Sequence, residues 1–162
     1  MKSGKIQIIK IEGFHSPYTT PPVPDLEEID GHDLPKCKQK WIRPILPDDD
    51  DVDKMSDKEK SELIYREFIR RLRGYWFMNN GEPTYITGDY YFYLTYWFIG
   101  AITKDGYPEY RKANRDWMYV VDFCEKDRNC MGLIAMCQKR DGKTERHLST
   151  LYNRATLIDE NC

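Results

Sequence analysis

The sequence lacks both the residue spacing of a metal site and a strong net charge. Its five cysteines form no C-x-x-C pair, and its three histidines are scattered along the chain, so the ligand spacing of a zinc site is missing. The formal net charge is −2, which argues against nucleic-acid binding driven by bulk positive charge. The odd number of cysteines and the lack of a signal-peptide pattern predict reduced thiols in a cytoplasm.

Long apolar runs are also missing. A membrane-spanning helix needs roughly 20 consecutive apolar residues, whereas the strongly aromatic stretch at residues 90–101 is too short and follows Asp89. We therefore expect no membrane contact. Aromatic residues, in contrast, are abundant: 12 Tyr, 6 Phe and 4 Trp, which cluster between Tyr75 and Tyr119. With 162 residues, the chain is long enough for one domain of ordinary size with a core in that region.

Residues 1–54 have the composition of an arm or linker. Seven of the nine prolines lie between Pro17 and Pro47, and an acidic run at residues 48–51 follows them. Proline fixes φ and removes a backbone donor, which favours an extended chain. We expect four apolar residues to pin this arm to a folded body: Trp41, Ile42, Ile45 and Leu46. Both a linker that follows the surface and an arm that docks to a partner fit this pattern.

A helical region is predicted for residues 55–128, and it opens with a capping box, Ser56-Asp57-Lys58-Glu59. The helix that follows carries apolar residues four positions apart, which predicts the side that it buries. These residues are Ile64, Phe68, Leu72 and Trp76, flanked by Leu63 and Ile69. Four arginines lie on other sides of the helix: Arg66, Arg70, Arg71 and Arg73. A solvated face and a contact with DNA phosphates are the two interpretations of these arginines.

Two more helices are expected in this region. Asn79-Asn80-Gly81 is typical of a turn, residues 85–87 form a brief extended piece, and Thr87 begins the second helix. Its packing residues are expected to be Tyr91, Leu94, Tyr96 and Trp97. A third helix is predicted over residues 110–126, ending at Asp127-Arg128-Asn129. Its predicted buried stripe is Ala113, Trp117, Val120, Val121 and Cys124.

Residues 129–162 resemble the start of a phosphate-binding unit. The short apolar run Leu133–Met136 predicts a buried strand, residues 137–141 form a polar loop, and Gly142-Lys143-Thr144 opens a predicted helix. This order of strand, loop and helix is the setting that a Walker A loop requires. The helix N-terminus favours an anion, Lys143 would reach the β- and γ-phosphates, and the Thr144 hydroxyl would hold Mg²⁺.

The loop departs from the usual pattern at one position. The pattern places a glycine five residues before Gly142, where this chain has Cys137, and a β-carbon there could crowd a loop that wraps a phosphate. The alternative interpretation is therefore an ordinary surface turn, rich in lysine and arginine, that caps a helix.

Three segments taken together are more specific than the Gly-Lys-Thr tripeptide. They are GYWFMNNGEPTYITGDYYFYLTYW from Gly74, GYPEYRKANRDWMYVVDFCEKD from Gly106, and GLIAMCQKRDGKT from Gly132. Together they resemble the large terminase subunit of tailed bacteriophages, the ATP-driven motor that packages DNA, and most of all the terminases of crAss-like gut phages. The resemblance covers about residues 55–157.

The resemblance also implies roles for individual residues. Walker A loops of terminases often lack the first glycine and carry basic residues within the loop, which here are Lys139 and Arg140. Arg140 is expected to stabilise the γ-phosphate, with Lys139 as the second choice. Asp141 and Gly142 complete the ATP-binding loop. The adenine-contacting amide that the family places upstream matches Asn114, and asparagine offers the same donor and acceptor as glutamine on a shorter stem.

As a whole, the resemblance implies an α/β P-loop NTPase in the full protein. This chain would be its mostly helical N-terminal part, with about three helices, ending in the first strand, Walker A loop and helix. The implied cofactors are ATP and Mg²⁺, and the implied partners are the portal protein, the small terminase subunit and double-stranded DNA. The implied location is the host cytoplasm, at the procapsid during packaging and not in the mature virion.

Several parts of such a motor have no counterpart in the sequence. Leu157-Ile158-Asp159-Glu160 resembles a Walker B motif, but its apolar run is short and it follows the loop helix directly, so we interpret it as a helix end. One strand cannot form a parallel sheet. We therefore expect a fragment whose residues 132–162 are poorly buried, which binds nucleotide weakly and does not hydrolyse it.

Two other functions remain open from the residues. Another P-loop ATPase, such as a helicase, would share the strand, loop and helix but would not explain the aromatic block ahead of them. A non-catalytic binding or assembly module would use the three aromatic helices, with Gly-Lys-Thr as an ordinary helix start.

Overall fold

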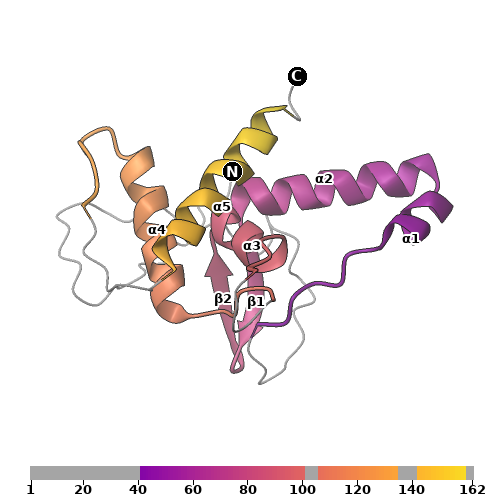
Figure 1. Cartoon of the computed structure of the whole chain (residues 1–162), viewed down its shortest axis with the longest axis horizontal. Helices are drawn as coiled ribbons and strands as arrows, with labels where there is room; N and C mark the ends of the chain where they lie inside the picture. Colours follow the sequence, from indigo (N-terminus) through magenta and orange to yellow (C-terminus); the bar gives the residue numbers. More distant parts are fainter. Residues whose placement is uncertain (1–40, 101–105, 135–141, 160–162) are drawn as a thin grey trace, which may run out of the picture.

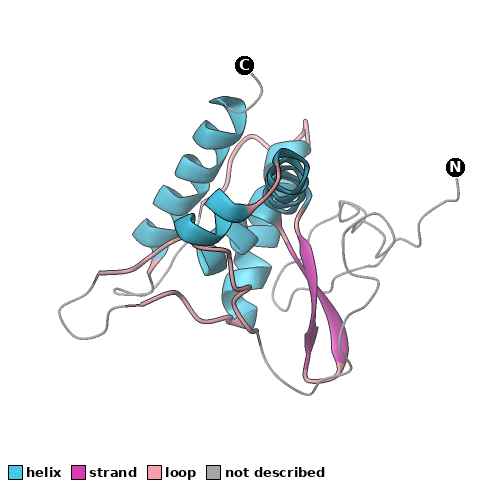
Figure 2. Ribbon diagram, turned by 90° about the vertical axis from the view of Figure 1, so that its right-hand side faces the viewer, coloured by secondary structure: helices cyan, strands magenta, loops and turns pink. Residues whose placement is uncertain are grey.

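The structure, a computed structural model, describes residues 41–100, 106–134 and 142–159. Five helices and one β-hairpin occur in these ranges: α1 (Asp49–Lys54), α2 (Asp57–Arg73), β1 (Tyr75–Asn79), β2 (Glu82–Ile86), α3 (Gly88–Thr95), α4 (Lys112–Lys126) and α5 (Lys143–Asp159). Helix α3 lies against the hairpin, α4 and α5 lie beside it, and α2 extends away from this body with α1 at its far end (Figure 1). Figure 2 shows the hairpin at one edge of the group of helices.

Helix α2 begins where the sequence predicts but buries a different side. The capping box is present, with Ser56 and Glu59 bonding each other's backbone N–H groups. The predicted apolar stripe is wrong, because Ile64 is 65% and Leu72 54% exposed, whereas Glu67 is buried. The helix also ends before Trp76, at Gly74, whose φ of 95° is open to glycine and strained for other residues.

The turn at residues 79–81 is confirmed as the tip of a β-hairpin. Asn80 and Gly81 have φ of 54° and 88°, and positive φ at both central residues is the geometry of the tightest hairpin turn. The register pairs Tyr75 with Ile86 and Asn79 with Glu82. The first strand was not predicted, because the helical spacing was extended through Trp76.

The core forms where the aromatic residues cluster in the sequence. Thr87 caps α3 as predicted, accepting from the Tyr90 N–H, and all residues of α3 except Asp89 are buried. The buried cluster consists of Phe77, Ile86, Tyr90, Tyr91, Tyr93, Leu94 and Met118. Of the predicted packing residues of α3, Tyr91 and Leu94 are fully buried, and Tyr96 and Trp97 are partly buried against the cluster.

Helices α4 and α5 follow the prediction in position more than in burial. Helix α4 ends at Lys126 and is capped by Asp127 as expected, but its buried residues are Met118, Tyr119, Val120 and Phe123, and Ala113 is exposed. The expectation of poor burial for residues 132–162 is wrong for α5, which packs against α3 and α2 and buries Arg146, Ser149, Asn153 and Leu157. Residues 157–159 belong to α5, in agreement with a helix end.

Within the arm, residues 41–48 are held to the body by two side chains, Trp41 and Arg43. Arg43 Nε donates to the Thr95 carbonyl at 2.7 Å, and its guanidinium lies 3.5 Å from the centroid of the Tyr107 ring. Trp41 makes edge contacts with Phe77 and Tyr91, at 5.2 Å and 6.3 Å between ring centroids. Ile42 and Ile45 are 63% and 97% exposed, so the prediction that they pin the arm is wrong. Residues 1–40, which include five of its prolines, lie outside the described ranges.

Candidate functional site

The predicted phosphate-binding residues that the structure describes lie at the start of α5. Gly142 has a φ of 68°, and Lys143 and Thr144 are the first two helical residues, all three exposed. The first helical hydrogen bond runs from the Arg146 N–H to the Gly142 carbonyl, at 3.1 Å. The backbone N–H groups of residues 143–145 therefore come before the first helical hydrogen bond and point out of the N-terminal end of α5. Lys139, Arg140 and Asp141 lie outside the described residues.

The strand predicted before the loop is wrong where it can be examined. Leu133 and Ile134 are 40% and 94% exposed and are not part of a strand, while residues 135 and 136 lie outside the described ranges. A short apolar run is consistent with a buried strand only when neighbouring strands pair with it. The described residues contain no strand besides the hairpin β1–β2, so Leu133 and Ile134 have no described strand partner.

The first turn of α5 is anchored to two other parts of the molecule. Trp97 donates its indole N–H to Glu145 Oε2 at 2.8 Å, and Arg146 donates from Nη1 to Asn114 Oδ1 at 2.5 Å. Arg146 is only 3% exposed. The structure therefore brings Asn114, at the start of α4, to the first turn of α5, although the two residues are 32 positions apart. The burial of Arg146 could not be predicted from the sequence, because a charged residue on a mostly polar helix is ordinarily expected to be exposed.

A cavity of about 400 Å³ lies between α4 and α5 and reaches the start of α5. Apolar side chains line it together with the basic residues Lys143, Arg146, His147 and Arg154. The His147 ring stacks on Trp117, with centroids 6.0 Å apart. Glu125 also lines the cavity and accepts from Arg154 Nη1 at 2.6 Å. Its lining favours a ligand that combines an anionic group with an apolar or ring-shaped part.

A hydrogen-bonded network fixes α5 on α2 and α3. Arg71 Nε donates to Asn153 Oδ1 at 2.9 Å, and Asn153 Nδ2 donates to Asp89 Oδ1 at 2.9 Å. Arg154 Nη2 donates to the second oxygen of Asp89 at 2.6 Å. Arg71 also donates to Thr156 Oγ1. These contacts commit the half-buried Arg71 side chain to the packing of α2 on α5, which fits neither a solvated arginine nor one that is free to contact DNA phosphates.

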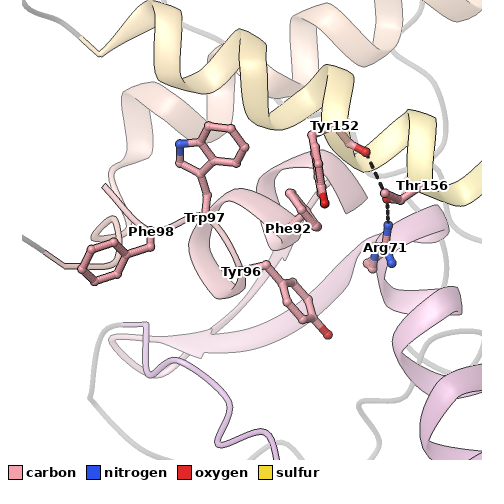
Figure 3. A pocket seen from close by; sticks show the side chains of 7 residues that line it. All are labelled: Arg71, Phe92, Tyr96, Trp97, Phe98, Tyr152 and Thr156. Atoms are coloured by element: carbon pink, nitrogen blue, oxygen red, sulfur yellow. Dashed lines mark hydrogen bonds between the residues drawn. The ribbon is translucent and has the colours of Figure 1, made fainter. Parts of the chain in front are cut away.

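A second, more open pocket of about 530 Å³ lies on the other side of α5 (Figure 3). Its lining is Arg71, Phe92, Tyr96, Trp97, Phe98, Tyr152 and Thr156. The Phe92 ring stacks on Tyr96 and on Tyr152, at 5.3 Å and 6.0 Å. Tyr152 and Phe98 are 58% and 56% exposed, so this pocket is an aromatic depression in the surface.

The start of α5 meets part of what ATP and Mg²⁺ require. A β-carbon at Gly142 would meet one atom at 4.0 Å, the Tyr93 hydroxyl oxygen, so the chain is not crowded there. Mg²⁺ in nucleotide sites takes one or two protein oxygens and completes its shell with phosphate and water, which the exposed Thr144 hydroxyl fits. Within the described ranges, no group of three His, Cys, Asp or Glu residues could hold a metal ion by itself.

Among the described residues, no helix is both long enough and apolar enough to cross a membrane. A comparison of the chain with protein-family models, curated proteins and solved structures finds no match.

Proposed function

We propose that this chain is the N-terminal part of a DNA-packaging motor, the large terminase subunit of a tailed bacteriophage, and that it binds MgATP through residues 137–144. Lys143 would contact the β- and γ-phosphates, Thr144 would hold Mg²⁺, and Arg140 would stabilise the γ-phosphate. Hydrolysis is not expected from this chain alone. In the complete motor the partners would be double-stranded DNA, the portal protein and the small subunit, in the host cytoplasm at the procapsid.

The observation that supports this proposal best is the division of α5 into two sides. The side that packs on α2 and α3 is mostly polar, with Arg146, Ser149 and Asn153 buried. The other side carries large apolar residues that are 48% to 66% exposed: Leu148, Leu151, Tyr152 and Ile158. In P-loop NTPases the helix after the loop covers one face of a parallel sheet. An exposed apolar stripe that begins one turn after Gly-Lys-Thr is the surface that such a sheet would bury.

The surroundings of Asn114 give a second line of support. Arg146 holds the Asn114 carbonyl oxygen, which leaves the amide N–H groups of this side chain to serve as donors to a base. The amide is thereby tied to the first turn of α5, where the phosphates of a bound nucleotide would lie. Such an arrangement lets one residue contact the base while the helix start holds the phosphates.

The proposal is tested by binding of a fluorescent ATP analogue to the full chain in the presence of Mg²⁺. Lys143→Ala is expected to abolish binding, and Arg140→Ala to weaken it. Lys58→Ala, at a lysine that is also exposed and lies in the first turn of α2, is the matched control and should bind as the parent does. Equal binding by the parent and Lys143→Ala would contradict a phosphate site at this loop. No binding by the parent would contradict the proposal that this chain binds ATP.

A helical assembly module is the second candidate, and the exposed apolar stripe of α5 also fits it. In that case a protein partner, rather than a sheet of the same motor, would cover the stripe. The two candidates differ in nucleotide dependence. The module predicts partner binding that Ile158→Glu abolishes and Lys143→Ala leaves unchanged, whereas the motor predicts that Lys143→Ala abolishes nucleotide binding.

A further inference from the structure

The cavity between α4 and α5 is a groove along two parallel helices, both of which pack on α3. Side-chain contacts pair the two helices in the same order along each: Asn114 with Arg146, Trp117 with His147, Met118 with Thr150, and Glu125 with Arg154. On α5 the lining extends from Lys143 to Arg154, roughly 16 Å of helix at 1.5 Å per residue. We call this cavity the α4–α5 groove, and its two ends can be compared.

The two ends of the α4–α5 groove differ in charge. At the far end, Arg154 is paired with Glu125 and Asp89, whose oxygens each lie 2.6 Å from one of its terminal nitrogens. At the near end, Lys143 and Arg146 line the groove, and no described residue forms an ion pair with Lys143. Among the described lining residues, Glu125 is the only carboxylate. The near end is therefore positive, and a charge in a concave, partly apolar surface attracts an anion more strongly than one on an open surface.

Between its ends the groove has apolar walls. Trp117, Met118 and Val121 contribute from α4, Leu151 from α5, and Leu133 from the segment that follows α4. The volume of about 400 Å³ lies near the lower end of the range of small-molecule sites, roughly 300–1,000 Å³. This size fits an apolar body of one or two rings.

The aromatic depression on the other side of α5 does not offer the same combination. Among the described residues that line it, Arg71 is the only charged one, and its guanidinium donates to Asn153 and Thr156. An anion bound there would have to replace hydrogen bonds that hold α5 in place. The α4–α5 groove is therefore the better site for a ligand that is both anionic and apolar.

We propose that the α4–α5 groove binds a small organic acid, with its single anionic group at Lys143 and Arg146 and a body of one or two rings between the apolar walls. Charge-assisted hydrogen bonds would hold the anionic group, and burial of the ring surface would add affinity. The ligand needs no phosphate, so this inference does not depend on nucleotide binding. Lys143 belongs to both sites, so a consequence that rests on the proposed function is competition between this ligand and the phosphates of ATP.

The test uses two fluorescent probes with the same rings, titrated into the full chain without nucleotide. Anilinonaphthalene sulfonate carries an anionic group, and phenylnaphthylamine lacks it. Lys143→Gln should weaken binding of the sulfonate by about tenfold and leave binding of the neutral probe within about twofold, because only the sulfonate contacts the lysine. Lys58→Gln, at another exposed lysine, is the matched control and should bind both probes as the parent does.

A second pair of variants tests the apolar walls. Val121→Phe places a larger side chain in the groove and should weaken both probes by about tenfold, because it takes up volume that the rings need. Val52→Phe, at a valine of α1 that is also half-buried, is the control and should leave both dissociation constants within about twofold. Circular dichroism of each variant checks that the helices are retained.

Three results would overturn the proposal. The first is a parent protein that does not bind the sulfonate probe. The second is a Lys143→Gln variant that weakens both probes equally or neither, which would mean that the lysine does not hold the anionic group. The third is loss of binding in Tyr152→Ala, at a residue that lines the aromatic depression, with binding unchanged in Val121→Phe, which would place the probe in the depression.

Discussion

The region around α3 and the contact surface of α5 are buried to a similar degree by opposite chemistry. In the first, Ile86, Tyr90, Tyr91 and Leu94 are 0% exposed and pack with aromatic neighbours. In the second, Ser149 and Asn153 are also 0% exposed, but Ser149 donates to the Arg146 carbonyl within α5, and Asn153 is hydrogen-bonded to the charged groups of Arg71 on α2 and Asp89 on α3. We call the first region the aromatic core and the second the polar seam.

The difference determines how each region specifies its geometry. Apolar contact is non-directional and proportional to the area removed from water, so the aromatic core contributes stability with some tolerance of exact placement. A buried polar group is favourable only when its partners are in place, so the polar seam allows few positions for α5. The core therefore supplies most of the free energy of folding, and the seam supplies the orientation of the helix that carries Lys143.

The strongest way to break the core is to remove a side chain at its centre. Leu94→Ala should lower the free energy of unfolding by about 3–4 kcal/mol, from lost burial and the cavity left behind. Leu148 on α5 is 48% exposed, so Leu148→Ala should lower the free energy of unfolding by less than about 1 kcal/mol. Urea unfolding followed by circular dichroism measures both. Similar losses in the two variants would mean that the core and the surface of α5 do not differ as described.

A close backbone approach connects the core to α2. A β-carbon added at Gly88 would lie 1.9 Å from the Arg71 carbonyl oxygen, so Gly88→Ala must push α2 and α3 apart. We expect this substitution to lower the free energy of unfolding by about 2–3 kcal/mol. Gly100→Ala is the control, because nothing lies within 4 Å of a β-carbon there. Thermal unfolding of the two variants compares them, and equal midpoints would contradict the contact between Gly88 and α2.

The sequence predicted the parts of this fold that depend on neighbours along the chain. The Ser56 capping box, the Thr87 cap and the turn at Asn80-Gly81 each need only a few adjacent residues, and all three are confirmed. The start of a helix at Gly142-Lys143 is local in the same sense. What the loop binds remains a prediction from resemblance.

The polar faces of α2 and α5 could not be predicted, because their partners are distant in the sequence. Glu67 reads as a surface residue until Tyr91 and Tyr96, 24 and 29 positions away, are placed beside it. Asn153 likewise depends on Arg71 and Asp89, which are 82 and 64 positions away. The expectation that a helix buries its apolar side therefore predicts the wrong buried side for α2. It also does not predict that α5 packs on the body through a polar side.

Asn153→Ala tests the seam. It removes the acceptor of Arg71 and a donor to Asp89, and we expect a loss of about 2 kcal/mol. Hydrogen exchange should rise in α5 more than in α3, since the seam holds α5 while the core remains packed. Asn129→Ala, at an exposed position after α4, should leave exchange in α5 unchanged. Equal increases in α3 and α5 would indicate that seam and core unfold as one unit.

The smallest expected loss of stability comes from removing the hydrogen bond that Tyr91, in the aromatic core, donates to Glu67 on α2. Tyr91→Phe removes a donor to a carboxylate that keeps two others, so the loss near pH 8 should be about 1 kcal/mol. Tyr65→Phe, at a hydroxyl on a 68% exposed residue, is the control and should change stability by less than about 0.5 kcal/mol.

The same variant sharpens the comparison through its pH dependence. Burial, and then the hydrogen bond to Glu67, raise the pKa of the Tyr91 hydroxyl above the ordinary tyrosine value. Above about pH 10 an unfolded tyrosine loses its proton while the folded one keeps it. The unfolded state then binds fewer protons, so stability falls as pH rises, by up to about 1.4 kcal/mol per pH unit for this group. The Tyr91→Phe variant has no hydroxyl to titrate at this position and lacks this loss of stability at high pH. The amount by which its free energy of unfolding falls below that of the parent should therefore shrink between pH 8 and 11, as measured by urea unfolding. A deficit that stays constant over this range would show that Tyr91 ionises as readily in the folded protein as in the unfolded chain.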